Sequence, residues 1–357
     1  MLVIFFLYLF YFFLFFSNAY SGGFYIEGTG TQALGRGGAF VAKPTDLTSL
    51  YYNPASLSAF KGGNILLQSA ALYERSDFLR SSELINNNNF SFYKVSNNTP
   101  WMAPIPAFVI SHNFGFDKLA FALGFISPLG GRFRYEEEGP QRYSVITSNL
   151  IQYYYGAGGA YNLIETSTNK FSVGAVFMFT DVIIDQKKAF TVNYSSFDDI
   201  KKDGLLKIEG KSLLNPLFIA GLSYSYKDLS VGFSFTPPLS IKAKSKIGIK
   251  TDASLDCEGI ATEVAKSSES LKSLTNPSGT LCNTLKVIPP SITVSIDDVK
   301  DAIIQFNLPF FVRAGIGYSF SRIYIEFAST YTGWSILKDI KVDLIDNEIS
   351  LKQEILG

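Results

Sequence analysis

From about residue 63 onward the chain repeats one kind of segment, in which large apolar side chains alternate with small or polar ones. Residues 229–236 read Leu-Ser-Val-Gly-Phe-Ser-Phe-Thr, and residues 171–180 follow the same rule. Because successive side chains of a strand point to opposite faces of a sheet, the pattern predicts strands with one apolar face and one face of small and polar residues. The predicted strands are about ten: 63–73, 103–113, 118–127, 143–161, 170–188, 204–226, 228–250, 302–320, 322–335 and 337–351.

Two all-β architectures produce this alternation. A soluble sandwich turns its apolar face inward, whereas a transmembrane barrel turns it toward lipid. The polar face of a sandwich meets water and is expected to be rich in Lys, Glu and Thr. Here that face is mostly Gly, Ser and Ala, and aromatic residues gather at the strand ends. The pattern therefore favours a transmembrane antiparallel β-barrel over residues 63–357.

The connections between the predicted strands alternate in length. Short links follow the even-numbered strands, whereas long polar segments follow the odd-numbered ones, at 74–102, 128–142, 189–203 and 251–301. Outer-membrane barrels have short periplasmic turns and long extracellular loops. We therefore expect a multi-pass barrel in the outer membrane, with the long segments facing outward and with outer-membrane lipid and lipopolysaccharide as its surroundings.

Composition agrees with this location. Charged residues make up 17% of the chain, compared with about 25% in an average soluble domain. Lys and Arg number 31, as do Asp and Glu, so no basic field attracts nucleic acid. Residues 1–16 form an apolar run shorter than the roughly 20 residues of a membrane helix. Small residues follow it, which predicts a cleaved signal peptide at 1–19 although no Lys or Arg precedes the run; an uncleaved anchor is the alternative.

Residues 20–62 do not alternate and are rich in turn-forming residues. Glycine permits tight backbone turns, an Asn side chain can bond to nearby backbone, and proline ends the element that precedes it. These features predict a compact hatch that plugs the barrel lumen, with a flexible arm as the alternative. The residues of this hatch motif are Gly35, Gly37, Gly38, Asp46, Asn53, Pro54 and Ala55.

The hatch motif, in this order just after a leader, resembles the N-terminal hatch of the FadL/TodX family of outer-membrane transporters for hydrophobic compounds. A second match lies far along the chain, where Leu308-Pro309, Gly315 and Tyr318, followed by Tyr-Thr-Gly-Trp-Ser at 331–335, resemble a late segment of the family. The resemblance implies a fourteen-stranded barrel plugged by the hatch. It also implies capture of a long-chain fatty acid or an aromatic hydrocarbon at the extracellular loops.

The family further implies lateral exit of the ligand through a gap near the third strand. In this chain Gly124 and Pro128 are the candidate sources of a kink there. Phe24 and Phe40 are the candidate ligand contacts. About ten strands fall short of the family's count, and an open sheet edge in lipid is costly. We therefore expect the barrel to be truncated at its C-terminal end, with a smaller closed barrel as the alternative.

Other polar residues give no sign of catalysis. His112 is the single histidine, and the sequence offers no further residues to complete a metal site or a hydrolase triad around it. We therefore expect no metal, no cofactor and no enzymatic activity. Cys257 and Cys282 share one predicted extracellular loop and are compatible with a disulfide or with two thiols. Arg313 and Glu326 lie on the small-residue face of adjacent strands. They could form an ion pair that holds the hatch, or each could be solvated in the lumen, and the sequence favours neither alternative.

The predicted function is passive uptake of hydrophobic molecules by a monomer, since no nucleotide site is present. Apolar pockets would offer such a ligand about 25 cal/mol per Å² of buried surface. A general diffusion porin is the first alternative, and it would need an open, charge-lined lumen without a plug. An outer-membrane hydrolase and a structural surface barrel are the others.

Overall fold

The computed structural model describes residues 29–79, 94–98, 101–191, 203–251, 300–345 and 350–354. The predicted signal peptide at 1–19, Phe24 and the pair Cys257 and Cys282 lie outside these ranges. The described residues form one antiparallel sheet of 13 strands and a second sheet of 2 strands. In this part of the chain, no helix has the length and apolar character needed to cross a membrane.

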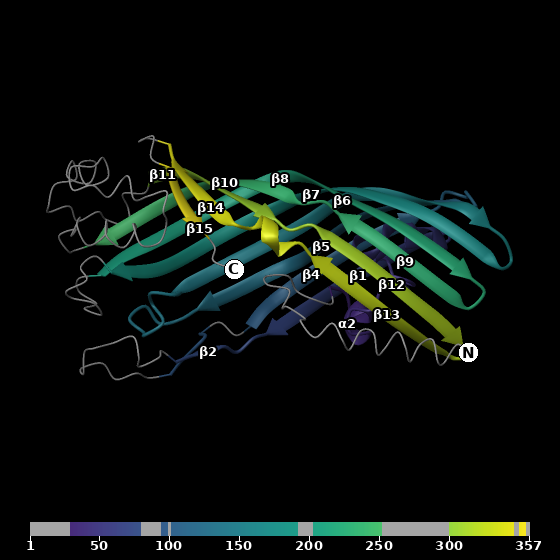
Figure 1. The fold of residues 1–357 in the computed structure, drawn as a ribbon, viewed down its shortest axis with the longest axis horizontal. Coiled ribbons are helices and arrows are strands. Elements are labelled where there is room, and N and C mark those ends of the chain that lie inside the picture. The colour runs from purple at the N-terminus through teal and green to yellow at the C-terminus, as the bar shows by residue number, and fades with distance from the viewer. Residues whose placement is uncertain are drawn as a thin grey trace.

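Strands that are close in sequence pair in the large sheet, so it is built mainly from antiparallel neighbours. The strands run slantwise along the long axis of the molecule (Figure 1). The first six are β1 (Gly63–Tyr73), β4 (Trp101–His112), β5 (Leu119–Arg134), β6 (Thr147–Glu165), β7 (Asn169–Thr191) and β8 (Asp203–Tyr226). The others are β9 (Leu229–Thr236), β10 (Leu239–Thr251), β11 (Lys300–Leu308), β12 (Phe311–Phe320), β13 (Ile323–Thr332), β14 (Asp339–Leu344) and β15 (Ser350–Glu354). The small sheet pairs β2 (Asp77–Phe78) with β3 (Val95–Ser96).

The count of 13 exceeds the predicted ten because three predicted strands are divided. Residues 228–250 are broken at Pro237-Pro238 and residues 302–320 at Pro309, since proline cannot donate a ladder hydrogen bond. Residues 337–351 contain two paired strands, β14 and β15. The third predicted strand also ended too early, because β5 continues past Pro128 to Arg134 through a register shift between Ile126 and Leu129.

These irregularities lie at one level of the sheet. The shift in β5 faces the stretch between Gln152 and Tyr154 of β6, and Tyr154 in turn pairs with Thr180, where β7 shifts against β8. Two residues separate β9 from β10 and two separate β11 from β12, and these gaps face each other. We call this row of interruptions the seam; it comprises 127–128, 181, 213–214, 237–238, 309–310 and 333–338. It divides the wall into a part near the short turns and a part beyond it.

The two faces of the wall differ on the short-turn side of the seam. Phe218, Phe233 and Phe235 point outward and are substantially exposed. The inward face carries small residues and buried apolar ones, and the N-terminal elements pack on it. Their shared apolar cluster includes Leu50 and Leu57 from the N-terminal segment. The core of this part thus lies between the sheet and the segment that precedes it in sequence.

A second apolar cluster lies on the inward face beyond the seam. Its buried members are Val182, Ile184, Ile241, Ala243, Ile304 and Leu308. In β9 the buried positions are even-numbered, from Ser230 to Thr236, whereas in β10 they are odd-numbered, from Ile241 to Ile247. The Pro237-Pro238 break therefore changes which face is turned inward, so that the apolar side chains face outward in β9 and inward in β10.

The two-residue turns β8–β9 and β12–β13 each hold an ordinary residue in the left-handed region. Lys227, in the two-residue link between β8 and β9, has φ 51°, and Ser321, between β12 and β13, has φ 55°. The left-handed conformation costs an L-residue about 1–2 kcal/mol, and glycine avoids this steric cost. These tight links keep the paired strands in register despite that cost.

Lys227→Gly is therefore expected to stabilise the folded protein by up to about 1 kcal/mol, after allowance for the added freedom of glycine in the unfolded chain. The measurement is the urea midpoint of the purified protein in detergent micelles. Thr168→Gly, in the β6–β7 turn where no residue has positive φ, is the control and should lower the midpoint. Equal shifts in both variants would contradict the strain argument.

Candidate functional site

The first turn of the N-terminal segment depends on two glycines. Helix α2 (Thr31–Gly35) is followed by Gly37 at φ 61° and Gly38 at φ 83°. The Gly38 N–H donates to the Ala33 carbonyl at 2.8 Å, which closes the end of the helix. Gly35 ends the helix with open space where a β-carbon would stand. The predicted motif thus contains two glycines with a backbone role and one without such a requirement.

Asn53 connects three parts of the structure. It is fully buried between α3 (Ser49–Tyr52) and the short 3-10 helix η1 (Pro54–Ala59). Its Nδ2 donates to the Val41 carbonyl at 2.9 Å and to the Leu222 carbonyl of β8 at 3.0 Å. Its Oδ1 accepts the Ala55 N–H at 3.2 Å. One amide therefore caps η1, holds the preceding loop and ties both to the wall.

Asp46 and Pro54 have local roles beside this amide. The Asp46 carboxylate accepts the N–H and the hydroxyl of Thr48 at 2.8 and 2.5 Å, which fixes the turn before α3. Pro54 occupies the first position of η1, where its missing N–H leaves no unmet donor. The hatch motif therefore describes mainly how this segment folds, and Asn53 provides its side-chain hydrogen bond to the wall.

A row of glycines in the wall receives the N-terminal backbone. Gly174 of β7 pairs with Gly221 of β8, and Gly232 of β9 pairs with Gly315 of β12. A β-carbon at Gly174 would overlap the Pro54–Ala55 peptide. One at Gly221 would overlap Asn53, one at Gly232 the Val41 carbonyl, and one at Gly315 would lie 2.9 Å from the Ala42 nitrogen. Only glycine allows this approach of backbone to sheet.

Glu326 of β13 is a second anchor for the same loop. Its side chain is 2% exposed. One carboxylate oxygen accepts the N–H groups of Val41 and Ala42 at 2.8 and 2.9 Å. The other accepts the Arg36 guanidinium at 2.6 Å and the Tyr324 hydroxyl at 2.9 Å. The buried negative charge is thus compensated by donors that come chiefly from the N-terminal segment.

Arg313 contacts that segment in a different way. Its guanidinium carbon lies 4.6 Å from the ring centre of Tyr51 and 4.9 Å from that of Phe311, and the residue is 3% exposed. Its Nη1 is 3.5 Å from the Thr236 hydroxyl. Arg313 and Glu326 therefore do not pair with each other within the described residues. Each makes its own contact to the N-terminal segment.

The other candidate residues within the described ranges are Phe40, Gly124 and Pro128. Phe40 is fully buried, with the Tyr52 ring at 5.6 Å and the Arg36 guanidinium over its face at 4.9 Å. Gly124 pairs with Val109 and Gly156 in a continuous ladder and lies under the Leu50 side chain. Pro128, in contrast, lies within the register shift of β5.

His112 has a structural contact. Its Nδ1 accepts the Phe114 N–H at 2.7 Å in the β4–β5 turn. Within the described ranges, no three His, Cys, Asp or Glu side chains gather closely enough to hold a metal ion.

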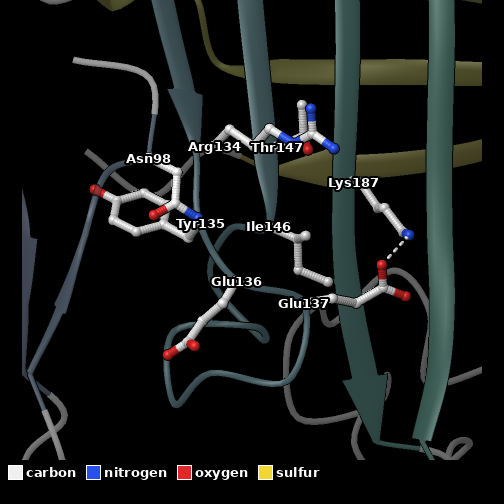
Figure 2. Close-up of a pocket in the computed structure, with 8 residues that line it drawn as sticks. All are labelled: Asn98, Arg134, Tyr135, Glu136, Glu137, Ile146, Thr147 and Lys187. Atoms are coloured by element: carbon white, nitrogen blue, oxygen red, sulfur yellow. Dashed lines mark hydrogen bonds and ion pairs between the residues drawn. The ribbon is translucent and has the colours of Figure 1, made fainter.

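A pocket of about 290 Å³ lies where β5, β6 and β7 continue beyond the seam. Figure 2 shows its lining, where the Lys187 ammonium lies 2.7 Å from the Glu137 carboxylate. Arg134 and Asn98 contribute further polar groups. This lining suits water or a polar solute better than an apolar ligand.

Sequence reasoning identified Asn53 and the N-terminal glycines but missed the glycine row. The signal was present as glycines on the small-residue faces of strands that the alternation already defined. Their cross-strand pairing was needed to bring Gly174 beside Gly221 and Gly232 beside Gly315. A register for the sheet would have revealed the row.

Comparisons with known proteins identify a family and several solved structures that this chain resembles. A family model described as outer membrane protein transport protein (OMPP1/FadL/TodX) matches residues 13–355. No curated protein matches the chain. Among solved structures, a Pseudomonas aeruginosa FadL homologue gives a TM-score of 0.62 at 14% identity, covering 92% of this chain and 74% of that one.

Two further structures are similar. The Pseudomonas putida toluene transporter TodX gives a TM-score of 0.58 at 12% identity, covering 94% of this chain and 78% of that one. The CymD monoaromatic hydrocarbon channel gives 0.54 at 14% identity, covering 92% and 75%. The chain thus has the β-barrel fold of these outer-membrane proteins and belongs to the OMPP1/FadL/TodX family of outer membrane transport proteins.

Proposed function

We propose that this outer-membrane protein is a passive channel for hydrophobic molecules and that residues 20–62 form a hatch in its lumen. Family membership supports transport rather than enzymatic chemistry. Two similar structures are those of a toluene transporter and a monoaromatic hydrocarbon channel, which supports small aromatic hydrocarbons as ligands. Long-chain fatty acids are the second ligand class.

The apolar cluster beyond the seam is the observation that carries this proposal. Ile184, Ile241 and Ile304 come from β7, β10 and β11, and all three face inward. Porin interiors are polar because their solutes travel with water. These side chains are at most 7% exposed, so they pack on one another until a ligand separates them. A hydrophobic molecule that enters between them gains about 25 cal/mol per Å² of buried surface, which water in a polar pore does not provide. This wall therefore suits hydrocarbons and fatty-acid chains and argues against a diffusion porin.

The hatch contacts fit a plug that is seated firmly and can still be released. Asn53 and Glu326 supply a few directional bonds, and the glycine row supplies close backbone contact. A ligand that binds the displaced arrangement better than the seated one would shift the equilibrium between the two. In the proposed cycle the ligand enters at the extracellular loops, meets the apolar wall, and passes when the hatch moves.

The bulge of β5 is the better candidate for a lateral exit through the wall. Pro128 lies in it, and proline removes one donor from the ladder. Gly124 is covered by Leu50 of the hatch, so exit at that position would require the hatch to leave. Phe40 would likewise contact a ligand only after the hatch has moved, because it is fully buried.

Cells that lack their own transporter are the system for the first test. Expression of this protein is expected to increase uptake of radiolabelled toluene, of a fluorescent fatty acid, or of both. The measurement is the initial uptake rate. The reference is Gly232→Trp, whose inward-facing side chain should block the lumen or prevent folding, so that no uptake is expected. Uptake equal to that of empty cells would overturn the proposal, and ion conductance without uptake would favour the porin.

Asn53→Ala is expected to loosen the hatch while the barrel remains folded. It removes the partners of the Val41 and Leu222 carbonyls, at a cost of about 1–3 kcal/mol. Planar-bilayer conductance should rise several-fold, and hydrocarbon uptake should change. Asn64→Ala, whose side chain bonds only to the nearby Lys61 and Gly62 carbonyls, is the control and should behave as wild type. Wild-type conductance of a folded Asn53→Ala protein would contradict the plug.

The Arg36–Glu326 pair offers a double-mutant cycle. Glu326→Gln keeps an oxygen for the Val41 and Ala42 N–H groups but loses the charge that holds Arg36. Glu326→Gln and Arg36→Gln should each raise conductance, and the double variant should add little to the larger single effect. The measured quantity is the coupling between the two effects. The control cycle combines Glu137→Gln with Lys187→Gln, an ion pair away from the hatch, and should leave conductance unchanged. Additive effects of the Arg36 and Glu326 variants on conductance would count against the anchor.

A further inference from the structure

The outward face of the wall is uncharged between the short turns and the seam. Along β8 the outward side chains of this part are Pro216, Phe218, Ala220, Leu222, Tyr224 and Tyr226. In β9 they are Leu229, Val231, Phe233 and Phe235. Strands β9, β12 and β13 have 8, 10 and 10 residues here, close to the roughly 9–11 of a transmembrane strand. The bilayer therefore covers this part, and the seam marks the edge of its outer leaflet.

Charge begins on the outward face directly beyond the seam. In β8 the first outward residue past the Leu213-Leu214 interruption is Lys211, which is exposed. In β10 Lys242 and Lys244 are exposed and alternate with the buried Ile241 and Ala243. Lys244 pairs directly with Lys211 across the two strands. We call Lys211, Lys242 and Lys244 the outer lysine patch.

No acid lies directly opposite a lysine of the outer lysine patch among the described residues. The acid on the same row, Asp343 of β14, is separated from Lys244 by Ile303 and accepts the Gln305 amide. Across from Lys211 on β7 is Ile183, and across from Lys244 on β11 is Ile303. Lys242 is paired with Gln305. None of the three lysines forms an ion pair with a described residue. Like charges directly opposite each other destabilise a sheet, so an external anion at this level would stabilise the wall.

The lysines farther out have a different environment. Lys207 lies 2.9 Å from Glu209, and this carboxylate raises the pKa of Lys207. Lys246 is paired with Glu209 on one side and with Asp301 on the other. On the membrane side of the patch, the nearest acid in the register is Asp181, which accepts the Leu214 N–H and the Tyr155 hydroxyl. The uncompensated charge is therefore confined to one level, just outside the apolar band.

We infer that the outer lysine patch binds the phosphate groups of lipopolysaccharide, the phosphorylated lipid of the outer leaflet. Lysine binds phosphate as a compact point charge, and several basic residues beside a membrane surface add their attraction to anionic lipid. The acyl chains of the same molecule would lie on Leu213 and Leu214, which are 53% and 61% exposed, and on Phe235. This headgroup site is independent of what the channel transports.

Titration of the purified full-length protein in detergent with lipid A tests the inference. Lys211→Gln with Lys244→Gln should weaken lipid A binding about tenfold, because two of three phosphate-facing charges are lost. Without lipid, the same variant should unfold at an equal or higher temperature than wild type, because the opposed pair is gone. A purely structural role for these lysines would instead lower the unfolding temperature.

Lys207→Gln with Lys246→Gln is the matched control, since it removes two lysines from the same two strands. It should leave lipid A binding within about twofold of wild type, because both lysines have carboxylate neighbours. Dephosphorylated lipid A, inorganic phosphate and phosphatidylglycerol vesicles are the other probes. Any one of four results would overturn the inference. These are that dephosphorylated lipid A binds as well as lipid A, that phosphatidylglycerol does so, that millimolar phosphate alone displaces lipid A, or that the two double variants lose equal affinity.

Discussion

The close approach of the N-terminal backbone to the inner face of the sheet is the contact on which the arrangement depends. The peptide groups of residues 41–42 and 53–55 lie directly over glycines of four neighbouring strands. Buried polar groups need hydrogen-bond partners, and the wall supplies them: the Glu326 carboxylate accepts the Val41 and Ala42 N–H groups, and the Leu222 carbonyl accepts the Asn53 side-chain amide. The glycines of the wall therefore make room for the N-terminal backbone, and the hydrogen bonds between the segment and the wall satisfy the polar groups that this close approach buries.

These contacts depend on the register of the sheet, and this dependence explains which parts of the molecule the sequence could predict. Alternation depends on the local period of a strand, so β1 was predicted at its observed bounds and most other long strands within a few residues. Breaks at Pro237-Pro238 and Pro309 were missed because the alternation resumes after each of them. In β10 the apolar residues stay odd-numbered, as in β9, although they face inward in β10 and outward in β9. A pattern search that tolerates interruptions joins such segments into one strand.

The site was predictable to a similar degree. Asn53 was identified because an Asn-Pro pair has local turn chemistry that does not depend on the rest of the fold. Glu326 and Arg313 were placed on the correct face, but their partners were not predictable. Their contacts join residues separated by 290 positions in one case, and nothing in the period of a strand encodes such a distance. The wall register supplies this information.

The anchors of the N-terminal segment differ in kind across the wall, and the difference bears on how the segment can move. Toward β13, Glu326 holds Arg36, Val41 and Ala42 by charge-assisted bonds. Toward β5, β6 and β7 the contacts are mainly apolar, through Leu50 and Leu57. An apolar contact can slide and can be replaced by an apolar ligand, whereas a buried carboxylate must keep its donors. In the cycle that we propose, a hydrophobic molecule would therefore displace the segment most easily from the β5–β7 side, where the bulge at Pro128 also interrupts the wall.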